Sequence, residues 1–261
     1  MSHLLPTPTK SHYVFNLRDL ARVVQGVMMM PKSSVPDDPA EGVQCYMRLW
    51  AHETLRVFYD RLVDTEDREW LLDLLREMIQ MHFKNNFDLI FSHLLEKSQT
   101  QVEIIFRVAF FSLSLKQVII LSLLMFHKTN KRLSFPTLGR ILQVDFEAMR
   151  KCFFGSYIDI EKDVGERVYS EAKDQLRVLS VLEEYLVDYN GLSKRPMNLA
   201  IFLFAAEHIS RICRILQQPG GSMLLVGVGG SGRQSLTRLS SYICGLEIFQ
   251  VESSTVQTLV A

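Results

Sequence analysis

Apolar side chains recur at helical spacing through much of the front half of the chain. The first run, NLRDLARVVQGVM over residues 16–28, places five apolar residues on one face and offers Asn16 as a cap. Residues 31–43 contain three prolines with serine and aspartate, a composition that predicts a loop. Helical patterning returns over residues 44–62 and 65–83, and the second of these begins with acidic residues, which the helix dipole favours there. These patterns predict a helical front part.

The back half predicts two more long helices and then strand-like patterning. Helices are expected over residues 174–189, ending in a left-handed turn at Asn190, and from Pro196 until a Pro-Gly-Gly stop at residues 219–221. The almost wholly apolar SMLLV (222–226) predicts a strand that is covered on both faces. LEIFQVE, after Gly245, is a second run with alternating character.

The most apolar stretch of the chain is VEIIFRVAFFSLSLKQVIILSLLMF, residues 102–126. Charged residues interrupt it, so its uncharged runs are too short to span hydrocarbon without a break. We interpret it as a buried or misplaced pair of apolar helices. A membrane-associated segment and a stretch that folds poorly are the two alternatives.

Composition narrows the classes of function. Lysine plus arginine and aspartate plus glutamate both total 29, so no net charge favours nucleic acid or an acidic membrane surface as a partner. The four cysteines lie far apart without a CxxC pair, which argues against a disulfide framework and a zinc site and favours a reducing compartment. The N-terminus shows no secretory signal. HETLR, from His52, has Arg56 where a zinc-protease helix needs its second histidine, so no metal site is expected, and no catalytic residue is assigned.

Residues 224–236, LLVGVGGSGRQSL, have the glycine spacing of a phosphate-binding loop, GxxxxGK[ST]. Because main-chain N–H groups and a helix N-terminus supply most of the grip on phosphate, nucleotide binding could survive changes of side chain. The predicted binding residues are Gly227, Val228, Gly229, Gly230, Ser231, Gly232, Arg233, Gln234 and Ser235. The alternative is a tight strand-to-helix turn that binds no phosphate.

Two substitutions in this loop predict weak chemistry. Arg233 replaces the usual lysine with a bulkier planar cation, and Gln234 replaces the hydroxyl that holds Mg²⁺. Ser235 is the nearest hydroxyl, but one residue along a helix is a rotation of about 100°. We therefore expect ATP or ADP to bind with weakly held Mg²⁺ and with little or no hydrolysis.

The loop and its surroundings resemble a known family. LLVGVGGSGRQSLTRL, with YNGLSKRPMNLAIFLFAAEHISRICRIL before it and EIFQVE after it, resembles the start of the fourth AAA+ module of an axonemal dynein heavy chain. LLPTPTKSHYVFNLRDLARVVQG and MRLWAHETLRVFYDRLVDTEDREWLLDLL resemble the helical lid of the third module. The resemblance covers about residues 1–90 and 175–252, whereas residues 95–145 and the end of the chain after FQVE depart from the family.

The resemblance implies a mostly α fold with a small α/β portion, in which a helical AAA+ lid is followed by the truncated start of a P-loop AAA+ α/β domain. The implied domains are a lid (1–90), an atypical apolar insertion with a basic connector (91–150), an inter-module linker (151–190) and the N-terminal part of the fourth module (191–261). Arg18 matches the lid arginine that reaches the phosphates of the third module's nucleotide. A surface arginine paired with Asp19 or Asp60 is the alternative.

The family implies a function for the whole motor. Six AAA+ modules form a ring that couples ATP hydrolysis to minus-end-directed movement along microtubules and bends cilia and flagella. The expected partners are the remaining modules, the intermediate and light chains, and microtubules, with no nucleic acid and no membrane. The expected location is the cytoplasm, the cytoskeleton and the axoneme of the cilium. Because the chain carries the lid of one site and the phosphate cradle of the next, we expect no ATP turnover by the chain alone. The alternative is a truncated, non-enzymatic structural or interaction protein with dynein-like helices and no nucleotide binding.

Overall fold

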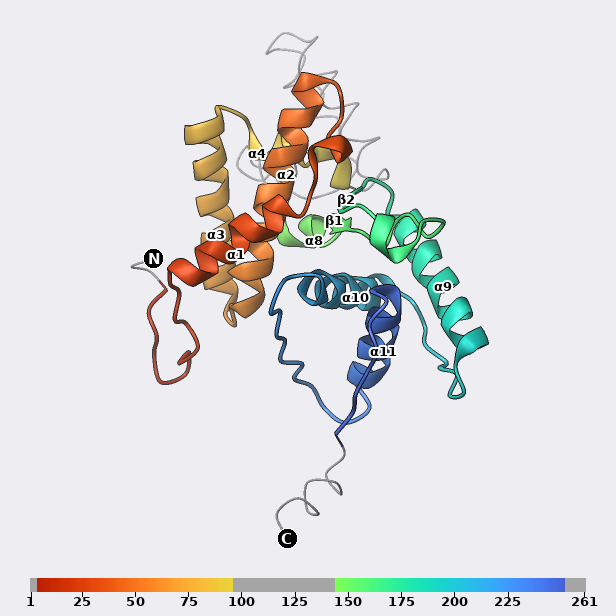
Figure 1. Cartoon of the computed structure of the whole chain (residues 1–261). Helices are drawn as coiled ribbons and strands as arrows, with labels where there is room; N and C mark the ends of the chain where they lie inside the picture. Colours follow the sequence, from red (N-terminus) through yellow and green to blue (C-terminus); the bar gives the residue numbers. More distant parts are fainter. Residues whose placement is uncertain (1–3, 96–143, 252–261) are drawn as a thin grey trace, which may run out of the picture. The chain divides into compact units, whose positions relative to one another are not determined.

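A computed structural model of the chain describes residues 4–95 and 144–251 (Figure 1). The apolar stretch at 102–126, the basic connector near 128–140 and the last residues of the chain lie outside the described residues. No helix of the described part is both long and apolar enough to cross a membrane. The chain divides into two compact units, one made of Met1–Val63 with Cys152–Ala261 and the other of Asp64–Lys151.

Helix α1 (Leu17–Met28) starts where the sequence predicts. The Asn16 side chain accepts hydrogen bonds from the first amides of the helix, and the Asp19 carboxylate accepts one from the Asn16 amide, which completes a capping box. The predicted apolar face, however, is largely exposed, since Leu17 is 83% exposed whereas Val23 is buried. The buried side of α1 is the one that carries Gly26, because the helix lies too close to Glu53 of the next helix for any side chain at that position.

Helix α2 (Pro39–Val57) begins earlier than the predicted start near residue 44. The last proline of the predicted loop occupies the first helical turn, where its missing N–H is not needed, and the Asp38 side chain accepts from the Ala40 amide. A short 3₁₀ turn, η1 (Lys32–Ser34), precedes the helix, and another, η2 (Tyr59–Arg61), follows it.

The smaller unit begins with α3 (Thr65–Met78), which continues as a π-helical turn, η3 (Ile79–Phe83), so the predicted helix over 65–83 is confirmed. It stops at Lys84, whose φ of 53° lies in the left-handed region. The other described elements of this unit are short: α4 (Phe87–Ile90), η4 (Ser92–Leu94) and α8 (Phe146–Met149).

In the larger unit, β1 (Phe153–Gly155) and β2 (Ser170–Ala172) form an antiparallel hairpin in which Phe153 faces Ala172, with the 3₁₀ turn η5 (Val164–Glu166) between them. Helix α9 (Gln175–Leu192) follows, with Asp174 as its cap. The left-handed stop predicted at Asn190 is wrong, because α9 runs through that residue.

Helix α10 (Leu203–Leu216) starts later than predicted. The segment after Pro196 is not helical because the Asn190 side chain binds both backbone polar groups of Met197, at 2.7 Å to its N–H and 2.9 Å to its C=O. The predicted stop is confirmed, and Gly220 adopts a φ of +65° just after the helix. Helix α11 (Arg233–Ile243) packs against α10, and with α9 they enclose the apolar core of this unit.

The two strands expected around the glycine loop are absent. Residues 222–226 and 246–251 form no strand, and Leu224 and Val226 are 87% and 83% exposed (Figure 1). A strand needs a hydrogen-bonded neighbour, and the hairpin of β1 and β2 is the only paired sheet in the described part of the chain. The prediction of a mostly helical chain is confirmed, but its strands lie elsewhere than the sequence pattern indicates.

Candidate functional site

The glycine loop forms a turn that leads directly into α11. Gly230 and Gly232 have φ values of +78° and +76°, which residues other than glycine rarely adopt. The Ser231 amide donates to the Val228 carbonyl at 3.3 Å and closes the turn. The helix after the loop is therefore as predicted, although the strand before it is not.

The start of α11 has the features of an anion site. No side chain caps the helix at Gly232, and the first turn contains no acidic residue. The first amides of a helix lack partners within the helix, so these N–H groups are directed toward the space at its N-terminus. A Cβ at Gly229, Gly230 or Gly232 would meet no heavy atom within 4 Å, so the space beside these residues is open. At Gly227 a Cβ would lie 2.8 Å from the Ser231 hydroxyl oxygen, so a larger residue there would displace this hydroxyl.

The side chains of the loop fit a nucleotide less well than its backbone does. The Arg233 guanidinium donates to the Val228 carbonyl at 3.3 Å, so its charge is turned onto the loop itself. Gln234 is exposed and presents a neutral amide, and Ser235 is half-buried in the first turn of α11. No cluster of three or more histidine, cysteine or acidic residues in the described ranges could hold a metal ion.

Arg18 lies at the exposed start of α1. Both acidic residues that could have paired with it bind other arginines: Asp19 pairs with Arg61 at 3.0 Å, and Asp60 pairs with Arg56 and Arg211. Arg18 is exposed, as the alternative of a surface arginine expects, but no ion pair joins it to Asp19, to Asp60 or to another described residue.

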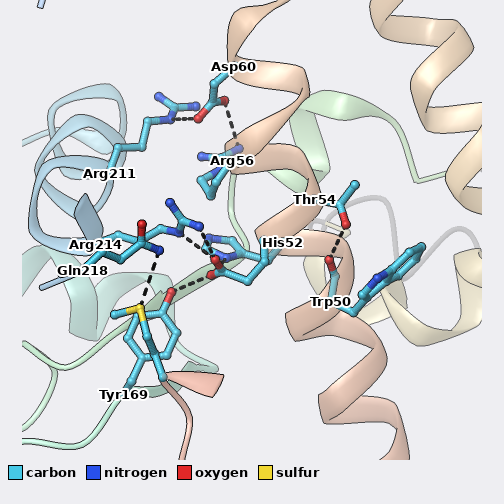
Figure 2. Close-up of polar contacts among 11 residues, drawn as sticks. Trp50, His52, Thr54, Arg56, Asp60, Tyr169, Arg211, Arg214 and Gln218 are labelled. Atoms are coloured by element: carbon cyan, nitrogen blue, oxygen red, sulfur yellow. Dashed lines mark hydrogen bonds and ion pairs between the residues drawn. The ribbon is translucent and has the colours of Figure 1, made fainter. Parts of the chain in front are cut away.

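A buried polar cluster that the sequence did not reveal joins α2 to α10. The fully buried Glu53 carboxylate accepts hydrogen bonds from the Tyr169 hydroxyl at 2.9 Å and from Nε of Arg214 at 2.7 Å (Figure 2). Nδ1 of the neighbouring His52 lies 3.1 Å from the same carboxylate. The HETLR segment, which fails as a zinc motif, thus supplies His52 and Glu53 to a cluster that holds α2 against α10.

The electrostatics of the cluster keep Glu53 ionised. Burial alone would raise its pKa, but the hydrogen bond from His52 and the charge of Arg214 outweigh burial and lower the pKa of Glu53 to about 2. Burial also lowers the pKa of His52, so this ring is neutral near pH 7 and Arg214 is the cation that compensates Glu53. A sealed ion pair of this kind is costly to break, because the remaining charge is left buried without a partner.

Further ion pairs accompany this cluster. At its edge, Asp60 accepts from Arg211 at 3.1 Å and lies 3.3 Å from Arg56 (Figure 2). Arg48 of α2 binds both carboxylate oxygens of Glu171 in β2, at 2.6 and 2.8 Å, a two-bond geometry that fixes orientation. The only sequence signal for these contacts is a charged residue on a helix face that is otherwise buried.

Two family models match separate parts of the chain. The family model for the dynein heavy chain ATPase lid domain matches residues 1–68, and the model for the P-loop containing dynein motor region D4 matches residues 197–258. Glu53 therefore lies in the lid match and Arg214 in the D4 match.

Full-length relatives give the same family. The chain is 39% identical over 254 residues to dynein axonemal heavy chain 12 of Mus musculus, which covers 97% of this chain and 7% of the relative. It is 38% identical over 252 residues to dynein axonemal heavy chain 3 of Homo sapiens, covering 97% of this chain and 5% of the relative. The human dynein axonemal heavy chain 6 is 33% identical over 251 residues, 96% of this chain and 5% of the relative. The chain thus spans only a small part of the length of these relatives, and it belongs to the axonemal dynein heavy chain family.

Proposed function

We propose that this chain is the part of a ciliary dynein motor that connects the lid of the third AAA+ module to the phosphate loop of the fourth. The buried pair of Glu53 and Arg214 supports this proposal, because it joins a helix of the lid match to a helix of the D4 match. In the whole motor, the chain would act with the other modules of the ring, with intermediate and light chains and with microtubules. That motor drives minus-end-directed movement in the axoneme of cilia and flagella.

The proposal places a nucleotide at the glycine loop. The backbone amides from Gly227 to Ser235 would hold the phosphates of ATP or ADP, and the observation that carries this assignment is the uncapped start of α11 behind left-handed glycines. Mg²⁺ would be held weakly, because Gln234 offers no hydroxyl. Phosphoryl transfer needs a positioned metal, a positioned water and balancing charge together, so we expect no hydrolysis by the chain alone.

Arg18 completes the proposal on the lid side. It is exposed at the start of α1 and has no ion pair among the described residues, so its guanidinium can reach toward the phosphates of a nucleotide in the third module. We also propose the domain limits suggested by the resemblance, with the lid over 1–90, the insertion and connector over 91–150, the linker over 151–190 and the fourth module from residue 191.

A second candidate function is a structural or interaction protein that keeps the dynein-like helices and binds no nucleotide. Two observations favour it: Arg233 is bonded to the loop's own backbone, and the segment before the loop is not a strand.

Titration of the chain with a fluorescent ATP analogue separates the two candidates. The unaltered chain should bind weakly, and Gly232→Val should weaken binding by about tenfold or more, since a β-branched residue cannot adopt a φ of +76° without strain and a misplaced turn loses its amide contacts. Gly165→Val is the matched control, because a Cβ there meets no atom within 4 Å and that glycine has no positive φ. Equal binding by Gly232→Val and the unaltered chain would contradict the nucleotide site. No binding at all would support the structural alternative.

A further inference from the structure

Two cysteines meet where the end of α11 packs against α10. Cys213 lies on the buried side of α10, and Cys244 caps the end of α11. Sγ of Cys213 lies 3.9 Å from the Ser240 carbonyl oxygen, one turn before Cys244, and Sγ of Cys244 lies 3.9 Å from the carbonyl oxygen of Cys213. The two thiols are close enough for each to shift the pKa of the other. Each sulfur therefore reaches the helix that carries the other one.

The two thiols differ in reactivity. Cys213 is buried, whereas Cys244 is partly exposed. The hydrogen bond from Cys213 lowers the pKa of Cys244 against the opposing effect of burial, and the charge of Arg167 lowers it further. The same hydrogen bond, with burial, raises the pKa of Cys213. Since the thiolate is the reactive form, Cys244 is the thiol that reacts first and Cys213 keeps its proton.

A cavity of about 370 Å³ lies at this end of α11, and its lining includes Tyr242 and Gly245, which flank Cys244 in the chain. Arg167 also lines it and donates to the Ile243 carbonyl at 2.9 Å, which holds this cation at the end of the helix. A small polar oxidant such as a peroxide therefore has room near the end of α11, where Cys244 is the partly exposed thiol.

We propose that Cys213 and Cys244 are an oxidation site that forms a reversible disulfide between α10 and the end of α11. The Cys244 thiolate attacks one oxygen of hydrogen peroxide, the O–O bond breaks, and the products are a sulfenic acid on Cys244 and hydroxide. The Cys213 sulfur then attacks the sulfenyl sulfur. The S–S bond forms as the S–O bond breaks, and the departing hydroxide takes the Cys213 proton and leaves as water. A dithiol reductant returns both thiols.

The other two cysteines of the chain provide a built-in control. Burial raises the pKa of Cys45 to about 11 and raises that of Cys152 still further, and the charge of Glu171 acts in the same direction on both. Both side chains are buried, so neither forms a thiolate or meets an oxidant readily. Oxidation should therefore select Cys213 and Cys244.

The test treats the purified 261-residue chain with hydrogen peroxide, blocks the remaining thiols by alkylation, and digests it with trypsin without reduction. Mass spectrometry should show peptide 212–214 joined to peptide 239–261 with the loss of two hydrogen atoms, and dithiothreitol should separate them. Cys244→Ser should abolish the joined species, whereas Cys45→Ser with Cys152→Ser should keep it.

A second measurement needs no oxidant. Phenylarsine oxide bridges two neighbouring thiols, so the reduced chain should bind it at one equivalent and Cys244→Ser should lose this binding. Because the unaltered chain gives the main result in both experiments, the test does not depend on whether Cys244→Ser folds. Sulfinic acid on Cys244 without a joined peptide, a joined peptide that contains Cys45 or Cys152, or a disulfide between two chains would each overturn the proposal.

Discussion

The Glu53 cluster contains a negative charge of the protein itself, whereas the start of α11 at the glycine loop presents hydrogen-bond donors and no acidic residue. At Glu53 the carboxylate is part of the protein, and Tyr169, His52 and Arg214 already contact it away from water. At the loop, the donors are in place at the start of α11, the surroundings are open, and no acidic residue of the first turn faces them. One unit thus contains both a buried carboxylate that its own side chains contact and a helix start that no side chain caps.

The largest predicted effect comes from removing the cation of the buried pair between Glu53 and Arg214. Arg214→Met leaves the buried Glu53 carboxyl group without its compensating cation, and such losses cost about 3–5 kcal/mol in the free energy of unfolding. Urea denaturation followed by circular dichroism measures this loss. Arg177→Met in α9 is the control, and because its pair with Glu184 is half exposed, about 1 kcal/mol or less should be lost. Equal losses from the two variants would show that the Glu53 cluster is not an energetic centre.

A pH titration tests the Glu53 cluster through a smaller change in the free energy of unfolding. The pKa of His52 is lowered from its ordinary value of 6.5 by burial, so the unfolded chain takes up a proton below pH 6.5 before the folded chain does. Stability should therefore fall as the pH drops below 6.5, with a slope of at most about 1.4 kcal/mol per pH unit from this residue. Since the pKa of Glu53 is also lowered, from 4.5 to about 2, its contribution is lost only between those values. In chemical denaturation at several pH values, His52→Gln should flatten the slope between pH 6.5 and 5, whereas His82→Gln, at an exposed position, should not. An unchanged slope in His52→Gln would assign the pH dependence elsewhere.

The smallest predicted effect concerns the glycine loop, where Arg233→Lys should change the affinity for nucleotide. The substitution removes the hydrogen bond to the Val228 carbonyl and supplies the compact ammonium group that usually contacts nucleotide phosphates. Affinity for a fluorescent ATP analogue should rise by about threefold to tenfold, which corresponds to roughly 1 kcal/mol. Arg238→Lys, further along α11, should leave affinity unchanged. Weaker binding by Arg233→Lys would mean that the guanidinium itself holds the phosphates.

The sequence predicted the features that depend on near neighbours in the chain. The cap at Asn16, the helix from Thr65 to Phe83 and the glycine turn before α11 are each specified by residues within a few positions of one another. Features that depend on distant residues could not be predicted in this way. Glu53 and Arg214 are 161 positions apart, and neither shows in the sequence that it has a partner.

The errors have the same origin. The late start of α10 depends on a side chain of the preceding helix, Asn190, that competes for the backbone of Met197. The strand expected over 222–226 has the right residues, but a strand exists only where another strand pairs with it. Periodicity describes what a segment can bury, and contacts elsewhere in the fold decide whether it does so.

Gly26 allows α1 to pack directly against the ion pair of Glu53 and Arg214. A Cβ at this position would overlap the Glu53 carboxylate and lie 2.9 Å from a guanidinium nitrogen of Arg214, so the backbone of α1 rests directly on the ion pair with no side chain as a cushion. A side chain at position 26 would push α1 away from the pair, so glycine at this position allows α1 to pack directly where α2 and α10 meet.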